Sequence, residues 1–145
     1  MVTTFLPYPC FKESVKCLDD SRLGKQRVEC HQILGILLDW PTKGGKKRTG
    51  WVNHPAVRMW RGYPDALKLY MNKSVIEWVE RGKVNNYELW DCTDREVINP
   101  PWIGDERVHR SHRQVLLYKD YNWYSQYGWV EEPKYDYHWP IQLSK

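Results

Sequence analysis

One carboxylate, Glu29, lies on a helical face that otherwise consists of cations and amides. At about 100° per residue, the polar side chains of the segment 20–40 share one arc and its apolar side chains share the opposite arc. The polar arc contains Arg22, Lys25, Gln26, Glu29 and Gln32. A donor-rich surface suits a polyanion, and a single acid within it can stabilise a cationic intermediate or transfer a proton.

A second interpretation of the same residues stays open. Lys25 and Glu29 are spaced i,i+4, which is also the spacing of an ordinary ion pair on the surface of a helix. Such an exposed pair contributes only about 0.3–0.5 kcal/mol. The sequence alone does not decide between a catalytic carboxylate and this surface pair.

The charge is concentrated in one part of the chain. The segment 21–61 holds nine Lys and Arg against two acids, although the whole chain of 145 residues has a net charge of only +4. The rest of the chain therefore carries −3. A basic pole of this kind is typical of a phosphate-binding surface. The length suits one domain, residues 1–145, and is short for two.

The composition indicates a cytoplasmic protein that is not secreted. No apolar run approaches the length of a membrane span, and the first residues lack the pattern of a secretion signal. No two of the four cysteines have the spacing of a CxxC pair, so they are interpreted as reduced, buried thiols. We expect no membrane association and, from size and charge, a monomer.

The periodicity predicts a mostly α protein. We expect a compact, single-domain bundle of three main helices over 20–40, 64–81 and 105–119, followed by an irregular aromatic C-terminal tail. Shorter helices are expected over 11–18 and 55–61, where Pro7, Pro9 and Pro55 limit the possible starts. Pro41 is expected to end the first long helix, and Gly82 the second.

Three further residues have apolar surroundings in the predicted helices. His109 and His112 have a spacing that could present two metal ligands, but an inward-facing His112 and the cation Arg113 favour structural histidines. Arg27 projects toward the apolar arc, so we expect first a structural role, with its charge at the edge of the core or against a buried acid such as Asp65 or Asp105, and second a phosphate contact. We expect no metal site.

Two further segments are candidates for nucleic-acid contacts. Lys46, Lys47 and Arg48 form a basic loop before His54, which is either a solvated surface loop or a phosphate-contacting one. Nine aromatic residues lie between Tyr118 and Trp139. Those around 123–127 either stack on bases or pack on the core, whereas packing is favoured for those around 135–139.

Three blocks of the chain resemble a known family. Residues 53–55 (Asn-His-Pro) lead through a helix to residues 76–82 (Ile-Glu-Trp-Val-Glu-Arg-Gly), and residues 123–128 read Trp-Tyr-Ser-Gln-Tyr-Gly. With the basic helix before them, these blocks are similar to the pyrimidine-dimer DNA glycosylases of the phage endonuclease V type, and more closely to a microbial and viral branch grouped with them. The likeness follows the same order along most of the chain.

The resemblance implies a DNA glycosylase with an associated abasic-site lyase activity on damaged or modified pyrimidines, which needs no cofactor. In that family an N-terminal α-amine attacks the sugar, and a helix glutamate assists. Val2 would carry this amine once Met1 is removed, although the family begins with Thr. The family's glutamate precedes a Leu-Pro pair, but here Arg22 precedes Leu23; Glu29 is therefore the expected catalytic acid, with Asp20 as the alternative.

The resemblance makes double-stranded DNA the expected partner, in the nucleoid or in an infected cell. The residues expected to contact it are Arg22, Lys25, Gln26, Lys46, Lys47, Arg48, His54, Trp123, Tyr124 and Tyr127. The alternative is a non-catalytic nucleic-acid-binding module on the same scaffold, and a weaker one is a protein-interaction domain. Covalent trapping on abasic DNA distinguishes the enzyme from the module.

Overall fold

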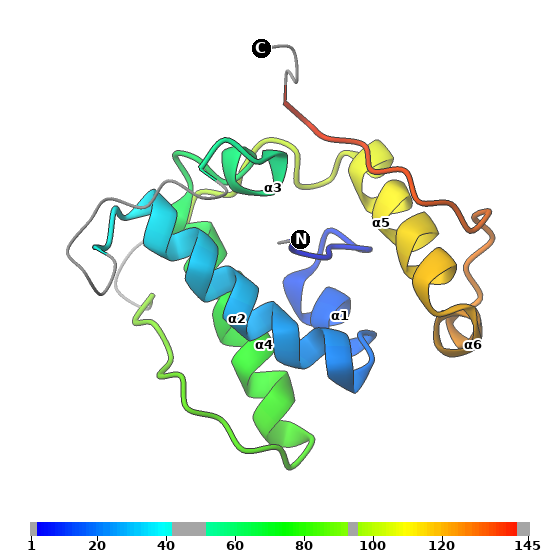
Figure 1. Cartoon of the computed structure of the whole chain (residues 1–145), viewed down its shortest axis with the longest axis horizontal. Helices are drawn as coiled ribbons and strands as arrows, with labels where there is room; N and C mark the ends of the chain where they lie inside the picture. The colour runs from blue at the N-terminus through cyan, green and yellow to red at the C-terminus, as the bar shows by residue number, and fades with distance from the viewer. Residues whose placement is uncertain (1–2, 42–51, 93–95, 142–145) are drawn as a thin grey trace.

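The computed structural model describes residues 3–41, 52–92 and 96–141, and within these residues the protein is helical without strands (Figure 1). This confirms the mostly α prediction. The long helices are α2 (Asp20–Leu37), α4 (Pro64–Glu80) and α5 (Glu106–Lys119). The short ones are α1 (Phe11–Lys16), α3 (Pro55–Arg58) and α6 (Tyr121–Tyr124), and a 3₁₀ turn, η1 (Ser125–Tyr127), follows α6. None of the described helices is long and apolar enough to cross a membrane.

The long helices begin where the sequence offers caps. The Asp19 carboxylate accepts a hydrogen bond from the Arg22 N–H at the start of α2, and Asp105 accepts one from Arg107 at the start of α5. At α4, Pro64 occupies the first turn, where a missing N–H costs nothing. At α3, His54 is the cap, and its side chain accepts from the Ala56 N–H.

Helices α2 and α4 cross at close range (Figure 1). Gly24 lies at this crossing, and a Cβ atom there would come within 2.9 Å of the Trp78 ring. A glycine inside a helix costs about 1 kcal/mol relative to alanine, so its presence here is explained by the close approach of Trp78. Gly24 therefore has a packing role.

The third long helix does not complete a simple three-helix bundle. α5 faces α2 and α4 across the N-terminal segment, residues 3–7, which runs through the middle of the molecule (Figure 1). All five residues of this segment are buried. An extended segment in a core must have its backbone polar groups paired, and side chains of the surrounding helices supply the partners.

Candidate active site

Two histidines of α5 hold the N-terminal segment from one side. The Leu6 N–H donates to His112 Nδ1 at 2.8 Å, and His109 Nδ1 lies 2.8 Å from the Leu6 carbonyl oxygen. His109 Nε2 accepts from the Gly104 N–H, so the His109 proton is on Nδ1 and is donated to Leu6. Both histidines are fully buried, and burial lowers the pKa of His112 to about 3. The interpretation of His109 and His112 as structural residues is confirmed.

Side chains of α2 and α4 hold the same segment from the other side. Gln26 Oε1 accepts from the Phe5 N–H at 2.7 Å, and Gln26 Nε2 donates to the Thr3 carbonyl oxygen at 2.7 Å. The Tyr70 hydroxyl donates to the Phe5 carbonyl oxygen. Gln26 was expected among the DNA-contacting side chains, but it is fully buried. The surface position was wrong, because the N-terminal segment covers this part of the polar arc.

The segment leads to Glu29. The Thr3 N–H donates to Glu29 Oε2 at 3.2 Å, and Gln26 Nε2 lies 3.4 Å from Glu29 Oε1. Burial raises the pKa of Glu29 to about 7, against the opposing effects of the Thr3 N–H and the nearby Lys25 and Lys119. A carboxyl group with this pKa is divided between its protonated and ionised forms at neutral pH. It is therefore suited to both accept and donate a proton.

Cations surround Glu29 in a surface pocket. Arg22 and Lys25 of α2 line it together with Lys119 at the end of α5. Among the described residues, neither Lys25 nor Lys119 forms an ion pair within 4.0 Å, so the alternative interpretation of Lys25 and Glu29 as a surface ion pair is wrong. Three cations around one carboxylate leave the pocket with an excess of positive charge, which fits an anionic ligand.

The far wall of this pocket was missed by the sequence analysis. It consists of Lys119, Tyr135 and Tyr137, and the Lys119 ammonium lies 5.1 Å from the centre of the Tyr135 ring. Tyr135 is 50% exposed, so its ring is accessible at the rim. In the sequence, the only indication of this wall was that the helix ending at Lys119 is followed by an aromatic tail. Packing of the tail on the core explained that pattern equally well.

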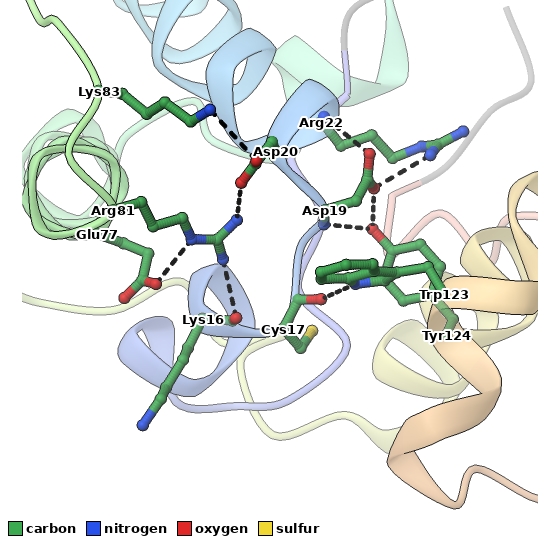
Figure 2. Close-up of polar contacts among 10 residues, drawn as sticks. All are labelled: Lys16, Cys17, Asp19, Asp20, Arg22, Glu77, Arg81, Lys83, Trp123 and Tyr124. Atoms are coloured by element: carbon green, nitrogen blue, oxygen red, sulfur yellow. Dashed lines mark hydrogen bonds and ion pairs between the residues drawn. The ribbon is translucent and has the colours of Figure 1, made fainter.

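Asp20, the alternative acid, belongs to a different cluster. It forms ion pairs with Arg81 at 2.9 Å and Lys83 at 3.4 Å, and Arg81 also binds Glu77 and the Lys16 carbonyl oxygen (Figure 2). Hydrogen bonds from Arg81 and Lys83 lower the pKa of Asp20. Asp20 thus connects α2 to the ends of α1 and α4, and it does not line the pocket around Glu29.

The C-terminal aromatic motif docks on the turn between α1 and α2 (Figure 2). The Trp123 indole N–H donates to the Cys17 carbonyl oxygen at 2.8 Å, and the Tyr124 hydroxyl donates to Asp19 at 2.5 Å. Tyr124 is fully buried, which contradicts the surface position that a DNA contact requires, whereas Trp123 remains 36% exposed. The half-buried Tyr127 ring packs near Tyr124 and Trp129.

Asp19 connects this motif to the pocket. Its carboxylate accepts from Tyr124 and also pairs with the Arg22 guanidinium at 3.1 Å. Arg22 in turn lines the pocket around Glu29. The docked motif therefore supports a pocket residue through Asp19 without lining that pocket itself.

The remaining predicted residues lie elsewhere. His54 caps α3 by accepting the Ala56 N–H at Nδ1, its ring packs edge-on against Trp139, and it does not line the pocket. Burial lowers the pKa of His54. Val2, Lys46, Lys47 and Arg48 lie outside the described residues.

Arg27 has the structural role that its position predicted, but its partner is not an acid. Its guanidinium lies 4.4 Å from the centre of the Trp78 ring and donates to the Asn85 side-chain oxygen at 2.8 Å. Asp65 and Asp105, the expected partners, instead pair with Lys68 and Arg107. The aromatic face offers a cation favourable contact without the cost of burying an ion pair.

These features define a class: a helical protein that brings a carboxylate of raised pKa, the N-terminal segment and three cations together at one pocket. A family model described as pyrimidine dimer DNA glycosylase matches residues 2–91. Since this is more than half of the 145 residues, the chain belongs to the pyrimidine dimer DNA glycosylase family. No curated protein and no solved structure matches the chain.

The family assignment confirms the resemblance, and it makes DNA the class of substrate. The matched residues include α1 to α4, and therefore Glu29, Arg22 and Lys25. They end before α5, so Lys119 and the aromatic motif at 123–128 lie outside the match.

Proposed function

We propose that the protein is a DNA glycosylase with an associated abasic-site lyase activity on damaged or modified pyrimidines in double-stranded DNA. The observation that carries this proposal is the hydrogen bond from the Thr3 N–H to Glu29, inside a pocket lined by Arg22, Lys25 and Lys119. Val2 directly precedes Thr3, so an α-amine on Val2 is one peptide unit from the group that binds Glu29.

The α-amine is the nucleophile in this mechanism. Its ordinary pKa of about 8, against about 10.4 for a lysine, leaves far more of it unprotonated at neutral pH. It attacks C1′ of the deoxyribose, a C–N bond forms, and the bond from C1′ to the pyrimidine breaks with its electron pair going to the base. The attached nitrogen then loses a proton to Glu29, and its lone pair forms the second C1′–N bond as the C1′–O4′ bond breaks. O4′ takes the proton from Glu29, and the product is an iminium ion between the protein and the opened sugar.

Strand cleavage follows from the iminium ion. Loss of a proton from C2′ allows the C3′–O bond to break, and the phosphate leaves with the electron pair. Glu29 assists by stabilising the cationic sugar and by transferring protons, for which a pKa of about 7 is suitable. Arg22, Lys25 and Lys119 bind the phosphates on either side of the opened sugar.

Other residues are proposed to contact DNA outside this pocket. Trp123, whose ring is partly exposed next to the turn before α2, and the half-buried Tyr127 are the remaining aromatic candidates for insertion into the base stack. The cations Lys46, Lys47 and Arg48 are proposed to contact the phosphate backbone. We propose that a monomer binds, because one chain contains the whole pocket.

Borohydride trapping tests the proposal. The protein is incubated with a duplex that contains one abasic site or one pyrimidine dimer, reduced, and digested for mass spectrometry. We expect a covalent adduct on the N-terminal peptide, and none in protein whose α-amine has been acetylated or extended. An adduct on Lys25 or Lys119 would refute the role of the α-amine, and binding without any adduct would support the non-catalytic module.

A further inference from the structure

Both polar atoms of the Gln26 side chain are hydrogen-bonded to the backbone of the N-terminal segment. Its Nε2 donates to the Thr3 carbonyl oxygen at 2.7 Å and lies 3.4 Å from Glu29 Oε1. Its Oε1 accepts from the Phe5 N–H at 2.7 Å and lies 3.0 Å from the Tyr70 hydroxyl oxygen, whose proton goes to the Phe5 carbonyl oxygen. The side chain is fully buried, so water does not compete for these bonds.

These hydrogen bonds link Gln26, Thr3 and Glu29 to one another. Thr3 is held at its carbonyl oxygen by Gln26 and at its N–H by Glu29, and Gln26 contacts the second Glu29 oxygen. Gln26 and Glu29 lie three positions apart on α2, so one rigid helix presents both groups. The position of Thr3 against Glu29 is therefore determined by this pair.

We propose that Gln26 is a positioning residue, which holds the start of the chain against Glu29 and orients the Glu29 carboxylate. The catalytic meaning of this role rests on the function proposed above, but the link between the two side chains does not. The amide is required because the segment offers an acceptor at Thr3 and a donor at Phe5. A glutamate would lose the donors and place a second negative charge beside Glu29, and a methionine would lose both kinds of bond.

Replacing Gln26 should raise the pKa of Glu29. Donors directed at a carboxylate favour its ionised form, so their loss raises its pKa. Replacing Gln26 removes one donor and releases Thr3, whose N–H is the other. The charged groups around Glu29 in the pocket, which are Arg22 and Lys25 on α2 and Lys119 on α5, are unchanged by the substitution.

The first test uses wild-type protein without DNA, in a pH titration followed by NMR. We expect the Gln26 side-chain amide protons to shift with the same midpoint as the Glu29 carboxyl carbon, and this shift to disappear in Glu29→Gln. A Gln26 amide that does not respond while Glu29 titrates would overturn the proposal. Because no DNA is used, this result is independent of whether the protein cleaves DNA.

The second test compares Gln26→Met with Ser74→Ala. Ser74 is a fully buried residue of α4 whose hydroxyl donates to the Tyr70 carbonyl oxygen, so its variant loses a buried bond without touching Thr3 or Glu29. We expect Gln26→Met to raise the Glu29 pKa by about one unit. It should also slow single-turnover cleavage by about tenfold or more, with DNA affinity within about threefold of wild type.

Ser74→Ala should change neither the Glu29 pKa nor the cleavage rate. Equal Glu29 pKa values and equal cleavage rates in the two variants would overturn the positioning role. If Gln26→Met does not fold, the wild-type titration decides. If wild-type protein shows the coupled titration but no cleavage, the proposed function fails while the link between Gln26 and Glu29 stands.

Discussion

Glu29→Gln should make the protein more stable above pH 7. The ordinary pKa of a glutamate is 4.5, whereas burial raises that of Glu29 to about 7 in the folded protein. Between these values the folded state binds the proton and the unfolded state does not, so the stability of the wild type falls as the pH rises. Above pH 7 Glu29 is ionised in the folded protein, and the full free-energy cost of holding this half-buried charge lowers the stability of the wild type. A glutamine at this position is uncharged, so the variant does not have this cost.

The magnitude follows from the two pKa values. At about 1.4 kcal/mol for each tenfold change in proton affinity, the difference between 4.5 and about 7 sets an upper limit of about 3.5 kcal/mol. Glu29 is partly exposed, so solvent screening reduces the expected gain to about 1 kcal/mol. The Thr3 N–H keeps an acceptor, because the glutamine side chain also carries a carbonyl oxygen.

Urea unfolding of both proteins between pH 4 and pH 9 measures this difference. The difference between variant and wild type should be constant below pH 4.5, increase from there to pH 7, and be constant again above pH 7. Titrations of other groups, such as the buried histidines, cancel in the comparison. A difference that does not depend on pH would refute the argument that Glu29 is ionised at a cost in the folded protein.

Three other substitutions test the packing and the charge of the site. Gly24→Ala should destabilise by about 1–2 kcal/mol in denaturant unfolding, because the clash with Trp78 exceeds the gain in helix propensity; a stabilised variant would contradict the close approach. His112→Leu should cost about 1–3 kcal/mol, since the buried Leu6 N–H loses its acceptor, and His112→Asn should recover part of this loss. Lys119→Met should reduce the slope of log affinity against log salt by about 1 if Lys119 binds a phosphate, and an unchanged slope would remove it from the interface.

The helices were predictable from local features. Caps at Asp19 and Asp105, the proline at the start of α4 and the periodicity of the apolar residues each depend on neighbours in sequence. The face that carries Arg22, Lys25 and Glu29 was predictable for the same reason, because helical geometry alone decides which side chains share an arc.

Contacts between distant segments were not predictable in this way. Gln26 lies on the polar arc of α2, and only the N-terminal segment that covers it makes it a core residue. Tyr124 is buried because Asp19 offers an acceptor more than a hundred positions earlier in the chain. Lys119 reaches the pocket because α5 ends beside α2 in space, which no pattern within either helix expresses.

The central claim is that Glu29 supports chemistry on DNA in this pocket. The most direct measurement is single-turnover cleavage of a duplex with one pyrimidine dimer by wild type and by Glu29→Gln, together with the affinity of each protein for that duplex. We predict that the wild type cleaves at the dimer and that Glu29→Gln binds equally well without cleaving. Equal cleavage by the two proteins would contradict the account.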